Sequence, residues 1–154
     1  MAVACCACGA PGDTQGAPSV GIVERIIDGD TIDVRLGSVV ERVRLIGIDT
    51  PEIAHPGDPS PAECGGDGAT AFTATATPVG SQVRLFRDVV PRDDYGRLLA
   101  YVERVDDDAL LNLLLAEAGY ADAMTIPPND RLKVEIGLAV SNARAAGRGM
   151  WASC

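Results

Sequence analysis

Short β-type segments follow one another along most of the chain and are separated by residues that favour turns. The clearest is Thr31–Leu36, in which apolar side chains alternate with polar ones at the period of two that is typical of a half-buried strand. The group Asp28-Gly29-Asp30 before it is suited to a hairpin turn, and Gly37-Ser38 marks another turn. This series predicts a small β-barrel with helices packed on it.

Five strand segments and up to three helices can be placed on the sequence. The expected strands are Gly21–Ile27, Thr31–Leu36, Val39–Ile48, Gln82–Val89 and Arg97–Val105. The expected helices are Ala69–Thr77, Ala109–Ala118 with Asp108 as its N-cap and Gly119 as its stop, and a last helix that Asp130 opens and that ends near Gly147. This set fits an α+β fold, a five-stranded OB-type β-barrel with about three packed helices.

The chain has 154 residues, about the size of one domain, and its 47% hydrophobic and 23% charged residues exclude a fully disordered protein. The longest apolar run, Ala109–Ala116, is interrupted by Asn112 and is far shorter than the ~20 residues of a membrane span. We therefore expect no transmembrane segment. Residues 1–19 are expected to be a leader, and residues 20–154 a single folded domain.

The leader begins with small apolar residues and continues with a polar stretch typical of a flexible linker. It is either a segment without a role or the remnant of an export signal, since the basic region of a complete signal is missing before Arg25. In a bacterial lipoprotein, one of Cys5, Cys6 and Cys8 would carry a lipid anchor. The protein is then expected to be secreted or associated with the cell envelope, with a cytoplasmic location as the alternative.

Cys64 and Cys154 stand apart from the early cysteines, and two interpretations are open for them. They are either free, buried, apolar side chains or the two halves of a disulfide. A disulfide would close a loop of about 90 residues, would be worth on the order of 4 kcal/mol if unstrained, and would imply an oxidising compartment.

The formal net charge is −9, from 22 acidic and 13 basic residues, and Lys133 is the one lysine among the bases. An overall positive field that would attract nucleic acid is therefore absent. If the protein binds phosphates, it must do so with a few placed arginines.

Charged residues concentrate in three groups at expected strand ends and turns: 28–31, 44–52 and 94–97. Taken singly, each group is explained as a turn, a strand end or a surface arginine. Together they read DGDT, then VRLIGIDTPE, then DxYGR followed by LLAYV, and GRGMW follows near the C-terminus. In this order, from about Ile22 to Trp151, the chain resembles the staphylococcal (micrococcal) nuclease family of thermonuclease-like domains.

The resemblance implies a five-stranded OB barrel with three helices, and it implies roles for individual residues. The family's calcium ligands correspond to the carboxylates of Asp30 and Asp49 and the carbonyl of Thr50. Its general base corresponds to Glu52, and its two phosphate-binding arginines correspond to Arg44 and Arg97. The implied reaction is calcium-dependent hydrolysis of DNA or RNA that leaves 3′-phosphate ends. The implied partner is a nucleic acid, single-stranded DNA or RNA, and the protein is expected to be a monomer.

These residue types suit that chemistry on physical grounds. Calcium prefers several oxygen ligands, and two aspartates with a carbonyl leave room for water and a phosphate oxygen. A glutamate can accept the proton of an attacking water, and arginine can bind two phosphate oxygens with its planar fork.

The sequence also departs from the family pattern. The best-known member is strongly basic and has a lysine where this chain has Asp94. The tyrosines on its base-binding side have no clear counterparts here, so Tyr95 and Tyr120 remain as stacking candidates, and Tyr120 is equally consistent with the core. We interpret His55 as a solvated loop histidine and Trp151 as a core anchor. The alternatives to an enzyme are a non-catalytic binding module of the same family and a surface-anchored protein.

Overall fold

The computed structural model describes residues 17–57 and 59–154. The expected leader falls almost wholly outside these residues, as do Cys5, Cys6 and Cys8, the candidates for a lipid anchor. Within the described residues, no helix is both long enough and apolar enough to cross a membrane.

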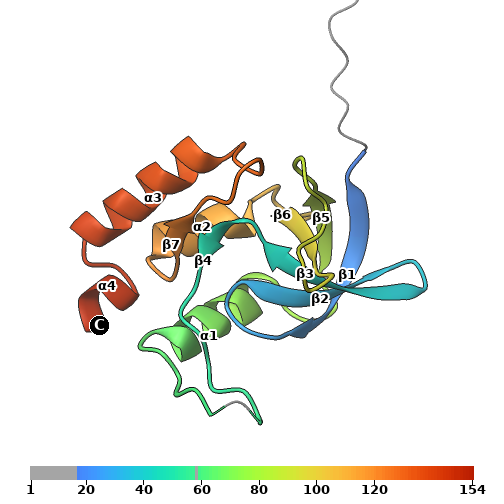
Figure 1. Ribbon diagram of the computed structural model, residues 1–154. Coiled ribbons are helices and arrows are strands. Elements are labelled where there is room, and N and C mark those ends of the chain that lie inside the picture. Colours follow the sequence, from blue (N-terminus) through green and yellow to red (C-terminus); the bar gives the residue numbers. More distant parts are fainter. Residues whose placement is uncertain (1–16, 58) are drawn as a thin grey trace, which may run out of the picture.

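Within residues 17–57 and 59–154, five strands close into a barrel, as predicted (Figure 1). The order around the barrel is β1-β2-β3-β6-β5, and the pairs are antiparallel except for β3 with β6, which is parallel. The barrel strands are β1 (Ser19–Ile26), β2 (Thr31–Leu36), β3 (Val39–Leu45), β5 (Gln82–Phe86) and β6 (Leu98–Arg104). The prediction of an α+β, OB-type fold is therefore confirmed.

Helix α2 packs between β6 of the barrel and α3, and α1 lies against α2 and β1 (Figure 1). The helices are α1 (Gly66–Ala76), α2 (Leu111–Ala118), α3 (Lys133–Ala145) and the short α4 (Met150–Ser153), which was not predicted. One continuous apolar core joins barrel and helices, because the branched side chains inside the barrel continue into the buried faces of α2 and α3. Its largest fully buried members include Ile32, Leu45, Leu85, Leu111, Leu115 and Ile136.

The expected strand Val39–Ile48 is two strands in the structure. Gly47 has a φ of 85°, a left-handed conformation that glycine adopts without strain, and it separates β3 from β4 (Gly47–Asp49). A Cβ at this position would lie 2.6 Å from Cδ1 of Ile136. The turn sends β4 away from the barrel to pair with β7 (Asp122–Met124), a small sheet that was not predicted.

All three predicted helix starts are wrong, since α1 begins at Gly66 and not at Ala69, and the starts of α2 and α3 differ as well. Asp108 is not the cap of α2, which begins at Leu111; instead it has a φ of 57° and its carboxylate pairs with Arg84 at 2.7 Å. Asp130 lies before the start of α3 and accepts the main-chain N–H of Lys133 through its own carbonyl. Gly119 does end α2, with the left-handed C-cap that was expected.

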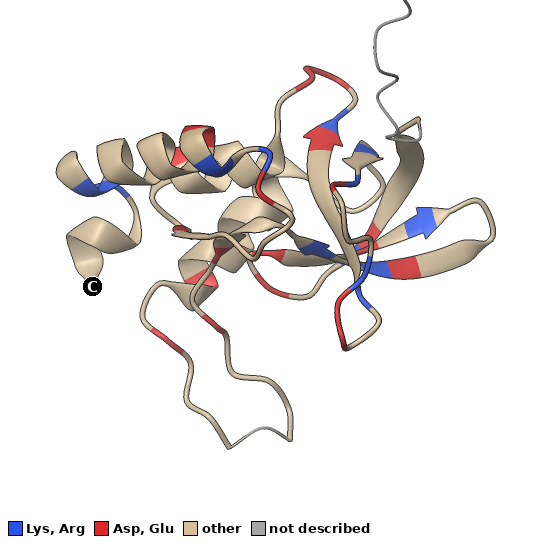
Figure 2. Cartoon of the chain, turned by 45° about the horizontal axis from the view of Figure 1, so that its top comes forward, with Lys and Arg blue, Asp and Glu red and all other residues tan. Residues whose placement is uncertain are grey.

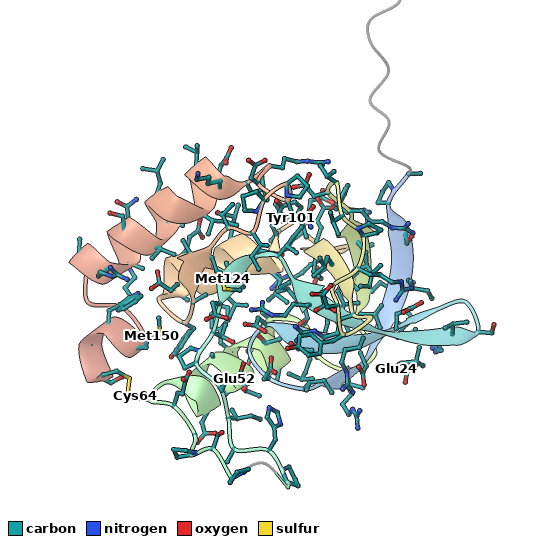
Figure 3. The ribbon with its side chains drawn as sticks, in the orientation of Figure 1. Glu24, Glu52, Cys64, Tyr101, Met124 and Met150 are labelled. Carbon is teal, nitrogen blue, oxygen red and sulfur yellow. A yellow bond between two sulfur atoms is a disulfide. The ribbon has the colours of Figure 1, made fainter. Side chains whose placement is uncertain are left out.

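Cys64 and Cys154 form a disulfide, which decides between the two open interpretations. It joins the segment just before α1 to the C-terminal residue, just after α4 (Figure 3). Trp151, in α4, packs partly buried against the core, and the Arg144 guanidinium lies 4.1 Å from its ring centroid. The core interpretation of Trp151 is confirmed.

Candidate active site

The register of the barrel strands brings the three charged groups to one end of the barrel. Thr31 of β2 is paired with Arg44 of β3, and Arg44 is paired in turn with Leu99 of β6. The turn before β2 therefore lies beside the end of β3, and the turn that carries Arg97 lies on the other side of it. These paired residues are 13 and 55 positions apart in the sequence, and they meet because of β-pairing and not because of any local pattern.

Asp30 connects the first group to the second. The residue is 3% exposed, and Oδ2 of its carboxylate accepts hydrogen bonds from the main-chain N–H of Thr50 at 2.8 Å and from Thr50 Oγ1 at 3.0 Å. Thr50 is buried as well. These contacts fix the segment after β4 against the turn between β1 and β2.

The Arg44 guanidinium lies between the two aspartates that were expected to hold a metal. Nη1 is 3.1 Å from Oδ2 of Asp30, and Nη2 donates to Oδ1 of Asp49 at 2.8 Å. Nη1 also donates to the carbonyl oxygens of Leu45 and Ile48. Since these partners come from β3, β4 and the β1–β2 turn, the position of the guanidinium is set by the fold before any substrate binds.

Asp28 was not assigned a role from the sequence, although it belongs to the DGDT group. It is buried, and its Oδ1 accepts the main-chain N–H of Asp30 at 3.0 Å. Burial, and then the negative charge of Asp30, raise the pKa of the Asp28 carboxyl to about 6. This end of the barrel therefore holds more buried negative charge than Arg44 neutralises.

Glu52 lies at the edge of this acidic group, with a side chain that is 58% exposed. His55 is half-buried rather than freely solvated, and its Nε2 is 3.7 Å from Oε2 of Glu52. Candidate ligand atoms of Asp28, Glu52 and His55 lie within 4.8 Å of one another. The sequence did not predict this group, because Asp28 is far from Glu52 and His55 along the chain and comes close to them only in the folded structure.

Arg97 is held by Asp93, which the sequence did not single out. Arg97 donates to the Asp93 carboxylate through Nε at 2.7 Å and through its main-chain N–H at 2.9 Å. These hydrogen bonds outweigh the effect of burial and lower the pKa of Asp93. Tyr95 is 86% exposed, and its ring centroid lies 5.4 Å from Cζ of Arg97.

Arg97 and Tyr95 separate two hollows at this end of the barrel. The larger has a volume of about 850 Å³ and contains Asp28, Glu52 and His55 in its wall, and it continues over β2 and β3 to Asp33 and Arg42. The smaller, of about 380 Å³, lies between Arg44, Tyr95, the β4–β7 region and Ile126–Asn129, and most of its wall is apolar. Of the predicted site residues, Arg44, Glu52, Tyr95 and Arg97 line one or both hollows, whereas Asp30, Asp49 and Thr50 are not among the lining residues. Asp30 and Asp49 pair with Arg44, and Thr50 donates to Asp30.

Tyr120, the second stacking candidate, packs beside the core. Its ring centroid is 5.5 Å from that of Phe72 in α1, and it is partly buried against the core cluster. The core interpretation of Tyr120 is therefore the one that its contacts support.

The residues at this end suit a hard cation. Asp28, Asp30, Asp49 and Glu52 offer carboxylate oxygens, and the raised pKa of Asp28 marks an excess of buried negative charge that a divalent cation would relieve. The described residues therefore fit a metal site.

Comparisons with known proteins agree with this arrangement. Residues 42–153 match the family model described as "Staphylococcal nuclease homologue". The chain is 41% identical to a thermonuclease of Staphylococcus intermedius over 130 residues, which cover 84% of this chain and 74% of that protein. It is 35% identical to a thermonuclease of Staphylococcus hyicus over 131 residues, covering 85% and 75% of the two chains. It is 32% identical to the endonuclease YncB of Bacillus subtilis over 129 residues, covering 84% and 60%. With its closed barrel, its charged groups meeting at one end and these similarities, the chain belongs to the staphylococcal nuclease family.

Proposed function

We propose that this hydrolytic nuclease of the staphylococcal nuclease family cleaves phosphodiester bonds of DNA or RNA with bound Ca²⁺ and leaves 3′-phosphate ends. The observation that carries the proposal is that Arg97 lines both hollows, while Arg44 lines the smaller one and Glu52 the larger one, beside buried carboxylates. These residues come from segments that are far apart in the sequence. The thermonucleases and endonucleases among the relatives support the same reaction class.

Asp30, Asp49 and the Thr50 carbonyl would hold the cation. The bound cation would supply Lewis-acid stabilisation of the charge that develops on the phosphate. Asp30 is already fixed by Thr50 and Arg44, which hold its carboxylate in place at this end of the barrel.

Glu52 is the proposed general base. Its carboxylate faces the larger hollow and is more than half exposed, so a water molecule can reach it. A positioned base of this kind contributes typically about 10²- to 10⁴-fold to the rate.

Arg44 and Arg97 would bind the phosphate oxygens from two sides. Each is already held by carboxylates of the protein, Arg44 by Asp30 and Asp49 and Arg97 by Asp93, so their directions are set in advance. Arginines placed in this way stabilise the transition state more than the ground state, because negative charge grows on the phosphate oxygens as the bond forms.

The nucleic acid would lie across both hollows, with a base stacked on Tyr95, which lines both of them. Stacking on an exposed aromatic ring is worth about 1–3 kcal/mol per base. We propose that the protein acts as a monomer. The disulfide supports export to an oxidising compartment.

The test is to compare the wild type with Glu52→Gln on single-stranded DNA and on RNA. Turnover is expected to fall by about 10²-fold or more, while binding of the nucleic acid and the far-ultraviolet circular dichroism spectrum stay unchanged. Analysis of wild-type products for terminal 3′-phosphate checks the direction of cleavage. Near-wild-type turnover of folded Glu52→Gln would remove Glu52 from the mechanism.

A further inference from the structure

Glu63 binds both main-chain polar groups of Glu52. The Glu63 carboxylate accepts the Glu52 N–H through Oε2 at 2.9 Å, and the Glu63 N–H donates to the Glu52 carbonyl at 2.8 Å. Glu52 and Glu63 thus form the neck of the segment that leaves the active site after β4 and returns to α1.

The neck is fixed to the rest of the molecule on the side of Glu63. The Gly66 N–H at the start of α1 donates to the Glu63 carbonyl at 3.1 Å. Gly66 also lies against the Glu52 carbonyl, since a Cβ on it would be 2.5 Å from that oxygen. Between these contacts, Cys64 is bonded to Cys154 at the end of α4 (Figure 3). The main chain of Glu52 is therefore tied to α1 and to the C-terminus.

The fold does not require the hydrogen bond between the Glu63 carboxylate and the Glu52 N–H. Both residues are exposed, so water could satisfy this N–H, and the carboxylate adds negative charge near a site that is already acidic. What a carboxylate adds is a directed, charge-assisted hydrogen bond that restricts where the Glu52 main chain, and with it the side chain, can lie.

We propose that Glu63, held in place by the Cys64–Cys154 disulfide, is a positioning residue that orients Glu52 toward the reacting phosphate. The proposal rests on the proposed role of Glu52 as general base. It assigns Glu63 no contact with substrate.

The first test compares Glu63→Ala, Glu63→Gln and the wild type by steady-state kinetics on single-stranded DNA. Glu63→Ala is expected to lower kcat between about tenfold and about a hundredfold with KM within about twofold, because a misplacement of about 1 Å can cost a factor of that order. Glu63→Gln keeps an oxygen that can accept the Glu52 N–H, so it should retain most of the activity. Glu117→Ala, which removes an equal charge from an exposed position in α2, is the control and should leave both constants unchanged.

The second test removes the disulfide with Cys64→Ser/Cys154→Ser, alone and combined with Glu63→Ala. If the disulfide acts through Glu63, the double cysteine variant should lose part of kcat, and the combined variant should lose less than the product of the separate losses. Fully multiplicative losses would mean that the two act independently, which contradicts the proposal.

Amide hydrogen exchange at Glu52 separates this proposal from the proposed function. Exchange of the Glu52 N–H should accelerate by about tenfold or more in Glu63→Ala and stay slow in Glu63→Gln, whatever the role of Glu52 in catalysis. If Glu52→Gln proved active, Glu52 would not be the general base. The exchange rate of the Glu52 N–H would still show whether Glu63 holds the main chain of Glu52. Unchanged exchange and unchanged kcat in folded Glu63→Ala, or an equal loss in Glu63→Gln, would overturn the positioning role.

Discussion

Arg44 is the residue on which most contacts of the site converge. It pairs with Asp30 and Asp49 and donates to the carbonyl oxygens of Leu45 and Ile48, in a position that is about nine-tenths buried. A lysine would keep the charge but not the planar fork that reaches these acceptors together.

We therefore expect Arg44→Lys to fold and to lose turnover by about 10²-fold or more, the cost of removing a directed donor to the transition state. Arg44→Ala should also lose stability, by roughly 3 kcal/mol, because it leaves two carboxylates without their buried partner. Steady-state kinetics and urea unfolding measure the two effects. Wild-type turnover in a folded Arg44→Lys variant would contradict the proposed role of the Arg44 guanidinium in binding the phosphate.

At the residue scale, the sequence predicted the residues that carry a motif and missed those that act through tertiary contacts. Arg44, Glu52 and Arg97 stand in recognisable motifs, and in the structure Arg44 lines the smaller hollow, Glu52 the larger one and Arg97 both. Asp93 and Glu63 hold two of them through hydrogen bonds whose partners depend on turn and neck geometry. An exposed glutamate 11 positions from Glu52 has no periodic pattern that would reveal such a contact.

At the scale of elements, the strands β2 and β3 also carry charged side chains that line the larger hollow. Asp33 of β2 pairs with both Arg25 of β1 and Arg42 of β3. The hydrogen bonds from these arginines outweigh the effect of burial and lower the pKa of Asp33. Arg42 lines the larger hollow and Arg25 is not among its lining residues, although both are exposed arginines on the same carboxylate.

This pair allows a matched comparison. Arg42→Ala should raise KM for an oligonucleotide by about tenfold, roughly the loss of one charge-assisted phosphate contact, with little effect on kcat. Its effect on a dinucleotide substrate should be smaller, since that substrate does not extend along β2 and β3. Arg25→Ala removes the same charge and the same kind of ion pair and should leave KM within about twofold. Equal effects of the two variants would argue against a substrate contact at Arg42.

Strands could be predicted where apolar and polar side chains alternate regularly. They could not be predicted where a single backbone angle determines where one strand ends and the next begins. β2 was placed with its observed bounds, since its apolar residues alternate without interruption. The break between β3 and β4 depends on the positive φ of Gly47, and the pairing of β4 with β7 joins short strands about 75 residues apart. The cap of α2 was misplaced because the Asp108 carboxylate pairs with Arg84 instead.

At the scale of the whole molecule, the excess of acidic residues is compatible with the proposed activity, because the arginines would act through direct contacts with the phosphate and not through a long-range field. Figure 2 shows short basic segments interspersed with acidic ones along the chain. With a net charge of −9, long-range attraction of a polyanion is weak, so binding should depend less on salt than in a basic nuclease. The sequence could not decide between a disulfide and two free cysteines, since only the packing of α4 beside the start of α1 brings Cys64 and Cys154 together.

The most direct test of the proposed function is hydrolysis of single-stranded DNA by the purified, disulfide-bonded protein, first with Ca²⁺ and then with excess chelator. We expect cleavage that requires Ca²⁺, stops on chelation, returns when Ca²⁺ is restored and yields fragments with 3′-phosphate ends. Folded protein that binds DNA or RNA in the presence of Ca²⁺ and cleaves neither would contradict the account and identify the barrel as a binding module.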